Sequence, residues 1–224
     1  TLASGQLSLG AAGFMSVGAY VGALLSLKAD LPIVVGILVG GFVAALVAVI
    51  IGLPTTRLKG LYLAIATLGF GEVVRVIFLN LDVTNGALGL SGIPSIPQEL
   101  TNFAYEIDID GLMGIDAVAW GNIMAIIILL IVLIFIIAFC VRINNSRVGR
   151  AFAAIKADDH AAELMGINVV YYKMMAFIIG AFIAGIGGGL YAHITNFINP
   201  TDFSYHKVVQ ILLFPVFGGS NVVW

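Results

Sequence analysis

Charge is scarce in this chain of 224 residues. Only 10% of the residues are Asp, Glu, Lys or Arg, whereas 61% are hydrophobic, and the mean hydropathy is +1.11. Soluble globular domains carry about 25% charged residues. This shortage excludes a water-soluble domain and indicates an integral membrane protein.

The chain also lacks the motifs of enzymes and of disulfide-rich proteins. The single cysteine, Cys140, lies in a hydrophobic run and excludes an intrachain disulfide. No lysine is followed by Ser or Thr, so there is no P-loop, and neither a GxSxG nor an HExxH motif occurs. His160, His193 and His206 do not have a metal-ligand spacing. We therefore expect neither a catalytic residue nor a bound metal or cofactor in this chain.

Long apolar runs are what the sequence has instead. A helix needs about 20 apolar residues to cross a bilayer, whereas the spans of membrane β-barrels are only about 10 residues and alternate. Four charge-free runs meet the helical length, and two weaker candidates add to them: 1–27, 31–56, 117–141 and 174–201, then 60–81 and 208–224. The sequence predicts an all-α polytopic helix bundle, formed by one transmembrane domain over residues 1–224. Because the chain begins with Thr and ends inside an apolar run, we expect both ends to continue in a longer protein.

The distribution of charge predicts the orientation of these helices. Residues 82–116 contain six carboxylates and no Lys or Arg, whereas residues 142–173 contain five Lys or Arg, and Arg57 and Lys59 make a short basic turn. Short basic loops stay on the cytoplasmic side. We therefore expect 82–116 to be an extracellular or periplasmic loop and 142–173 a cytoplasmic loop, with residues 28–30 outside.

Glycine pairs four residues apart suggest closely packed helices. Such pairs occur at Gly18 and Gly22, Gly36 and Gly40, and Gly185 and Gly189. This spacing lets two helix backbones approach each other, although it is common in membrane proteins generally. The glycine-rich segments 5–13 and 69–71 also suit broken or re-entrant helices whose free backbone groups line a cavity.

Two charged residues interrupt the apolar run 60–81. Glu72 and Arg75 are three residues apart and therefore share one helix face. Their pairing serves either the translocation pathway or the helix structure alone. Thr67 and Asn85 are further polar candidates for contact with the charged ends of a substrate, so the candidate pathway residues are Thr67, Glu72, Arg75 and Asn85.

The basic loop 142–173 is predicted to hold two short helices. Asn145 or Ser146 can cap the first, whose apolar stripe is Val148, Phe152 and Ile155. Asp158 and Asp159 interrupt this pattern and can cap a second helix. Gly166 can end the second helix in the left-handed conformation. A basic amphipathic helix either rests on anionic lipid or docks a protein, and the sequence alone leaves both possibilities open.

Several segments in order along the chain resemble one known family. Ala161 to Gly166, AAELMG, is similar to the Glu-Ala-Ala-x-x-x-Gly loop of ABC importer permeases, with His160 where Glu usually stands. The wider match is carried by GQLSLGAAGFMSVGAY, RLKGLYLAIATLGFGEVVR, TNGALGLSGIP, SRVGRAFAAIKADDHAAELMGI and VFGGSNVVW. Together these segments resemble the branched-chain amino acid permease family, LivM-type subunit, over nearly the whole chain.

The resemblance implies a fold of the type II ABC importer class in a prokaryotic cell inner membrane. It implies four kinds of partner: a homologous permease subunit, two ATP-binding cassette subunits that use the ATP, an extracellular solute-binding protein, and the surrounding lipid, with no nucleic acid. The residues implied to couple to the ATPase are Arg150, Phe152, Ile155, Ala161, Ala162 and Gly166. The resemblance also implies further helices before Thr1 and after Trp224.

Two other functions remain compatible with the sequence. Relatives within the same broad family carry urea or short amides, and no residue here rules those substrates out. An ion-coupled secondary carrier is the second alternative, although such carriers usually place carboxylates inside the membrane and only Glu72 qualifies here. A carrier also has no need of a docking loop, which makes the ABC permease the preferred interpretation.

Overall fold

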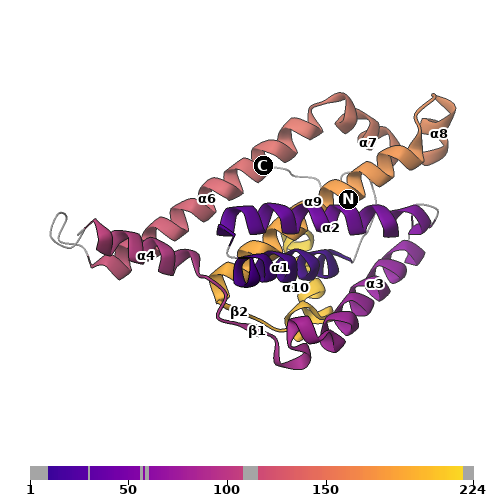
Figure 1. Ribbon diagram of the computed structural model, residues 1–224. Coiled ribbons are helices and arrows are strands. Elements are labelled where there is room, and N and C mark those ends of the chain that lie inside the picture. The colour runs from indigo at the N-terminus through magenta and orange to yellow at the C-terminus, as the bar shows by residue number, and fades with distance from the viewer. Residues whose placement is uncertain (1–9, 30, 56–57, 59–60, 108–115, 219–224) are drawn as a thin grey trace.

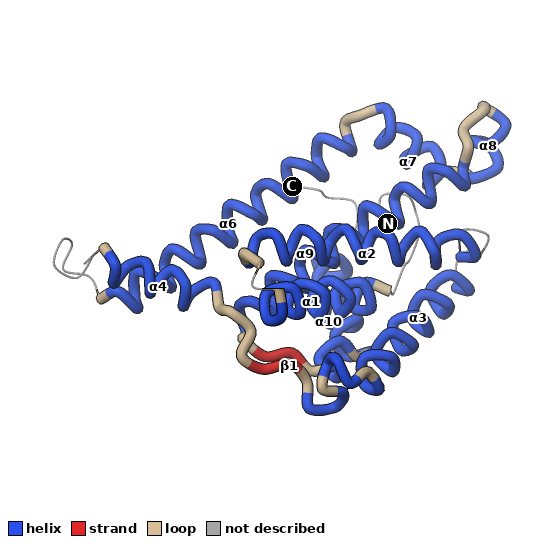
Figure 2. The backbone as a smooth tube through the Cα atoms, in the orientation of Figure 1, coloured by secondary structure: helices blue, strands red, loops and turns tan. Residues whose placement is uncertain are grey.

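The computed structural model describes residues 10–29, 31–55, 58, 61–107 and 116–218. Helices account for nearly all of it, with one short two-stranded sheet (Figure 2). In chain order the elements are α1 (Ala11–Lys28), α2 (Ile33–Thr55), α3 (Leu61–Asn80), η2 (Asp82–Thr84), η3 (Gly86–Leu88), β1 (Leu90–Ser91), α4 (Ile96–Glu106), α6 (Ala117–Asn144), α7 (Arg147–Ala157), α8 (Asp159–Leu164), α9 (Val169–Thr195), β2 (Phe197–Ile198), η4 (Pro200–Phe203) and α10 (Tyr205–Gly218).

Five of the described helices, α1, α2, α3, α6 and α9, are long and apolar enough to cross a membrane. The prediction of an all-α polytopic membrane protein is therefore confirmed. The predicted span 174–201 is shifted, because α9 already begins at Val169, where the Asn168 side chain accepts a hydrogen bond from the Tyr171 amide. Helix α10 has 14 residues, Tyr205–Gly218, and so covers 208–218 of the predicted span 208–224; residues 219–224 lie outside the described part.

The spanning helices alternate in direction as the charge pattern predicts. The end of α2 and the start of α3 lie on the same side of the molecule as α7 and α8, at the right of Figure 1. The start of α2 and the helix α4 lie toward the opposite, left side. The basic segment 142–173 and the described part of the acidic segment 82–116 are therefore at opposite ends (Figure 1), although Arg57 and Lys59 lie outside the described residues.

Helices α1, α2 and α9 form a core that glycine holds together. A Cβ atom added at Gly18 would collide with the backbone of Gly185 on α9, and one added at Gly22 would lie 3.3 Å from the carbonyl oxygen of Gly36 on α2. Gly40 of α2 in turn packs against the Gly18 carbonyl. The predicted glycine pairs thus form close backbone contacts among three helices.

The prediction of a break at Gly69 and Gly71 is wrong. Helix α3 continues through both residues from Leu61 to Asn80. Gly71 lies in a close contact with α1: a Cβ atom on Gly13 would lie 2.9 Å from the Cα atom of Gly71, whereas a Cβ atom on Gly71 would lie 3.8 Å from the Gly13 nitrogen. Glycine allows these two helices to approach while each keeps its own backbone hydrogen bonds. Of the other segment predicted to be broken, residues 5–9 lie outside the described part.

Helix α6 stands apart from this core. Its first turns pack on α4, where Gly121 meets Thr101 and Pro97, and where Ala104 and Ala117 are fully buried. Beyond this contact α6 diverges from α2 and α9 toward α7 (Figure 1). Only 6% of its most hydrophobic 18-residue window is buried, compared with 61% for α1. Helix α6 therefore leaves a long apolar surface available to the hydrocarbon of the bilayer.

The C-terminal ends of α1 and α9 lie against the segment between β1 and α4. Strands β1 and β2 pair antiparallel, with Leu90 opposite Ile198. His193 is fully buried; its Nδ1 donates a hydrogen bond to the Pro94 carbonyl at 2.8 Å, and its Nε2 lies 3.4 Å from Ser26 Oγ. One histidine thus links α9, α1 and the segment leading to α4.

Candidate functional site

The segment between α6 and α9 begins with a capped helix. Ser146 is the N-cap of α7, and its Oγ accepts hydrogen bonds from the amides of Val148 at 3.2 Å and Gly149 at 3.5 Å. Gly149 lies so close to the carbonyl of Asn144 that a side chain would not fit there. The sharp turn from α6 into α7 therefore requires both the serine cap and the glycine.

The apolar face of α7 packs inside this chain. Phe152 and Ile155 are 5% and 3% exposed, and Val148 is half-buried. The Phe152 ring meets the Tyr172 ring of α9 edge to face, with 6.3 Å between centroids. The predicted stripe is confirmed, but it is turned toward the rest of this chain, and α9 contacts Phe152. Phe152 and Ile155 therefore shape the loop, and neither faces lipid or a partner directly.

Helix α8 is held by a cap at each end. The Asp158 carboxylate accepts hydrogen bonds from the amides of His160 at 2.7 Å and Ala161 at 3.1 Å. At the other end Gly166 has φ +82°, and the Ile167 amide donates to the Ala162 carbonyl at 3.1 Å. This is a Schellman motif, so the predicted left-handed end of the helix is confirmed.

The tip of α8 exposes two large apolar side chains. Leu164 is 89% exposed and Met165 is 83% exposed, whereas Ala162 of the same turn is 4% exposed. Sequence reasoning missed both residues, although the helical period could have identified them. Leu164 is about 200° around the helix from the buried Ala162. Three predicted coupling residues are exposed in the same segment: Arg150, Ala161 and Gly166.

A buried ion pair fastens α8 to α9. The Lys173 ammonium binds the Asp159 carboxylate, and the two side chains are 9% and 25% exposed. Lys173 was predicted to end the loop 142–173, but it lies in the second turn of α9. An unpaired buried ammonium is strongly unfavourable, so this pair fixes where α8 sits on α9.

The candidate pathway residues form two local arrangements on α3. Thr67 is fully buried and donates hydrogen bonds to the carbonyls of Leu63 at 2.9 Å and Ala64 at 3.0 Å in its own helix. Arg75 Nε lies 2.7 Å from Glu72 Oε2, and both side chains are partly exposed.

Asn85 sits apart from that helix, in the turn between η2 and η3 with φ 54°. A cavity lies between α6 and the helices α2, α4 and α9, and none of the four candidate pathway residues lines it.

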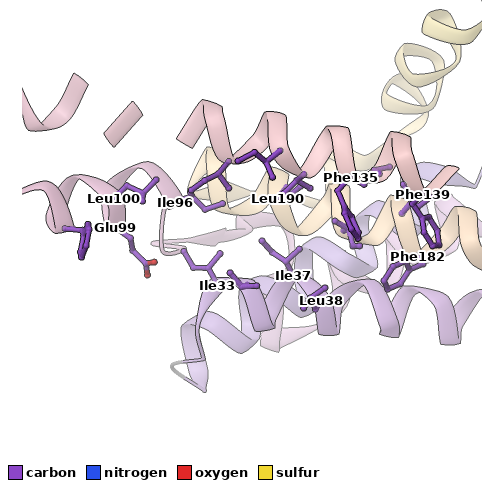
Figure 3. Close-up of a pocket in the computed structure, with 18 residues that line it drawn as sticks. Ile33, Ile37, Leu38, Ile96, Glu99, Leu100, Phe135, Phe139, Phe182 and Leu190 are labelled. Atoms are coloured by element: carbon purple, nitrogen blue, oxygen red, sulfur yellow. The ribbon is translucent and has the colours of Figure 1, made fainter. Parts of the chain in front are cut away.

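That cavity lies between α6 and the core and has a volume of about 710 Å³. Figure 3 shows its walls: Ile33, Ile37 and Leu38 from α2, Phe182 and Leu190 from α9, Phe135 and Phe139 from α6, and Ile96, Glu99 and Leu100 from α4. Of the 18 described residues that line it, Glu99 is the one with a charge. The cavity suits hydrocarbon and offers no described cation to pair with a carboxylate.

Known proteins match this chain along nearly its whole length. The family model described as branched-chain amino acid transport system / permease component matches residues 1–223. The chain is 33% identical to the high-affinity branched-chain amino acid transport system permease protein LivM of Escherichia coli, over 97% of this chain and 53% of that protein. The LivM protein of Salmonella typhimurium gives the same values.

A more distant relative is the probable branched-chain amino acid transport permease protein LivM of Methanocaldococcus jannaschii. It is 27% identical over 85% of this chain and 54% of that protein. The chain thus spans about half the length of the curated relatives it matches. No solved structure matches it.

Proposed function

Since the chain belongs to the branched-chain amino acid transport permease family, we propose that it is the transmembrane permease subunit of an ATP-driven importer for branched-chain, hydrophobic amino acids. In this proposal it forms half of the translocation pathway beside a homologous permease subunit. Two separate ATP-binding cassette subunits supply the energy. A solute-binding protein delivers the amino acid on the outer side.

One observation carries the proposal, namely the construction of the α7–α8 segment. Phe152, Ile155 and Ala162 are buried, and Phe152 and Asp159 contact Tyr172 and Lys173 of α9, while Leu164 and Met165 project at the tip. A large exposed apolar pair on a polar, capped segment is typical of a protein docking surface. Leu164 and Met165 would insert into a groove of the ATPase, and the exposed Arg150 would pair with a carboxylate beside that groove.

The acidic outer segment supports the second contact in this proposal. Asp82, Glu99, Glu106 and Asp116 are all exposed, and residues 82–116 contain no Lys or Arg. Such a surface attracts a partner with basic residues and speeds their encounter. The solute-binding protein would therefore present Lys or Arg to this end of the molecule.

Leu164→Glu tests the docking role. In a complex purified with its ATPase subunits, we expect this change to reduce recovery of the ATPase at least tenfold, because a carboxylate would be buried against an apolar groove at a cost of more than about 1.4 kcal/mol. The matched control is Leu88→Glu, since Leu88 is 82% exposed and belongs to the acidic segment 82–116, at the opposite side of the molecule from α8. The control should recover the ATPase normally.

Normal recovery of the ATPase with Leu164→Glu would contradict the docking role. Substrate class needs a separate measurement, namely uptake of radiolabelled leucine and of radiolabelled urea by vesicles that contain the complete complex. We expect ATP-dependent uptake of leucine only. Uptake of urea, or uptake of leucine that follows an ion gradient without ATP, would replace the proposed substrate or the proposed energy source.

A further inference from the structure

We infer that α9, and not α6, carries the movement of the α7–α8 segment across the membrane, with Lys173 and His193 as the positioning residues at its two ends. This inference rests on the proposed function, because it concerns how the ATPase would move the permease. Helix α6 precedes the α7–α8 segment and α9 follows it, so either helix could transmit the movement as far as sequence order is concerned. Their contacts within the chain differ.

At the inner end, two consecutive residues of α9 contact the two helices of the α7–α8 segment. Tyr172 packs against Phe152 of α7, and Lys173 pairs with Asp159 of α8. The Lys173 side chain is only 9% exposed, and a buried ammonium without its carboxylate is strongly unfavourable, so the two partners are expected to stay together when the segment moves. A displacement of α7 and α8 must therefore displace the first turns of α9.

In the membrane, α9 packs against α1 and α2 through close contacts between backbones. Gly185 touches Gly18 of α1 and lies against Gly41 of α2, and Gly188 touches the carbonyl of Met15. Side chains can change rotamer to absorb a small shift, whereas contacts between backbones cannot. Helices α1, α2 and α9 are therefore expected to move as one body.

At the outer end, α9 is bonded to the segment that leads into α4. His193 Nδ1 donates to the Pro94 carbonyl at 2.8 Å, and the Ile93 amide donates to the Asn196 carbonyl at 3.3 Å. His193 also approaches Ser26 of α1. A shift of α9 thus reaches the outer segment through short, directional contacts rather than through loose packing.

Helix α6 lacks this continuity. It contacts α4 at its outer end and α7 at its inner end, but the 710 Å³ cavity lies between its middle and the core. Figure 3 shows Phe135 and Phe139 of α6 on one side of this cavity and Ile37 and Leu38 on the other. Energetic coupling needs a contiguous set of packed groups. A cavity interrupts that set for α6.

Lys173→Gln tests the inner end in the complete complex, reconstituted with its ATPase subunits and binding protein. The measurement is the ratio of leucine transported to ATP hydrolysed. Coupling between distant sites typically changes an equilibrium at least about fivefold, and we expect the ratio to fall by that factor or more. ATPase subunits should still co-purify, because Leu164 and Met165 are untouched.

A charge exchange and a matched control separate transmission from simple damage. The double variant Lys173→Asp with Asp159→Lys should restore the ratio, since it restores an ion pair between α8 and α9. Arg142→Gln removes a cation from the last turn of α6 at the same membrane surface and should leave the ratio unchanged. An unchanged ratio in Lys173→Gln, or an equal fall in Arg142→Gln, would overturn the inference.

The outer end has its own readout. Ser91 of β1 is exposed, so a Ser91→Cys, Cys140→Ser variant can be labelled with a membrane-impermeant maleimide. The labelling rate should depend on ATP, and both Lys173→Gln and His193→Gln should abolish that dependence. ATP dependence retained in both variants would refute transmission through α9. Failure of the proposed function looks different, because the unmodified complex would then show no ATP-dependent uptake at all.

Discussion

Helices α6 and α9 flank the same α7–α8 segment and have nearly the same length, 28 and 27 residues. Their most hydrophobic windows have hydropathies of 3.6 and 1.9, yet only 6% of the α6 window is buried within the protein, compared with 28% for α9. The more hydrophobic helix is thus the less buried one. In a bilayer, hydrophobicity drives insertion, whereas association of helices depends on close packing.

Glycine explains the difference. Helix α9 contains five glycines and α6 contains one, Gly121. That single glycine lies where α6 meets α4, against Thr101 and Pro97. The bulky Ile, Leu and Phe side chains along the rest of α6 keep other backbones at a distance. The position of small residues therefore separates the packed core from the lipid-exposed helix.

The largest effect should come from filling the contact between α9 and α1. Gly188→Leu places a side chain against the backbone of Met15, where even a Cβ atom has no room, and we expect loss of folded protein in detergent. Gly187→Leu is the adjacent control, because a Cβ atom there meets nothing within 4 Å. Size-exclusion profiles of the two variants would measure this, and similar profiles would refute the role given to glycine.

A smaller effect is expected from removing one phenylalanine from each helix. Phe177 of α9 is 4% exposed and meets Phe14 edge to face at 5.3 Å between centroids. Phe177→Ala should lower the free energy of unfolding by about 3–5 kcal/mol, because it leaves a cavity in the core. Phe135 of α6 is 72% exposed, and Phe135→Ala should change the free energy of unfolding by less than about 0.5 kcal/mol.

Unfolding by denaturing detergent in mixed micelles would measure both phenylalanine variants. The ratio of the two effects matters more than either value. Equal losses would mean that α6 is packed as tightly as α9. In that case the contrast between the two helices would not hold.

The smallest effect concerns a hydroxyl group inside the core. The Tyr20 ring stacks on Phe78 with 4.3 Å between centroids, but its hydroxyl is buried without a hydrogen-bond partner among the described residues. Tyr20→Phe keeps the stacking and removes an unsatisfied polar atom, so stability should stay equal or rise by up to about 1 kcal/mol. Tyr62→Phe, at a position 75% exposed, serves as the control. A loss above 1 kcal/mol for Tyr20→Phe would reveal a polar partner for this hydroxyl.

Local features of the candidate site could be predicted from the sequence. Ser146, Asp158 and Gly166 act at helix ends through groups within three residues of themselves. The apolar stripe on α7 follows from the helical period alone. Such features need no knowledge of the rest of the chain, which explains why the outline of the segment was predictable.

Contacts between distant residues could not be predicted in this way. The pairing of Lys173 with Asp159 depends on how α8 folds back on α9, and the link from His193 to Pro94 joins residues 99 positions apart. Gly71 looked like a helix break, because the sequence does not show that Gly13 of α1 lies against it. The helical period places Leu164 opposite Ala162, but only the structure shows that Ala162 is the buried residue of the two.

The amino-acid sequence alone predicts that this protein crosses a membrane several times, which of its loops are basic and which acidic, and which family it resembles. These properties depend on composition and on the order of neighbouring residues. Apolar runs of sufficient length enter the membrane, and the helical period assigns nearby residues to one face, without any contact between distant segments. Only the tertiary structure decided which of two similar helices is joined to the core and which faces a cavity. Association of helices in a bilayer depends on whether small residues of distant segments meet. Lipid tails are as apolar as a helix surface, so hydrophobicity alone does not favour contact between two helices.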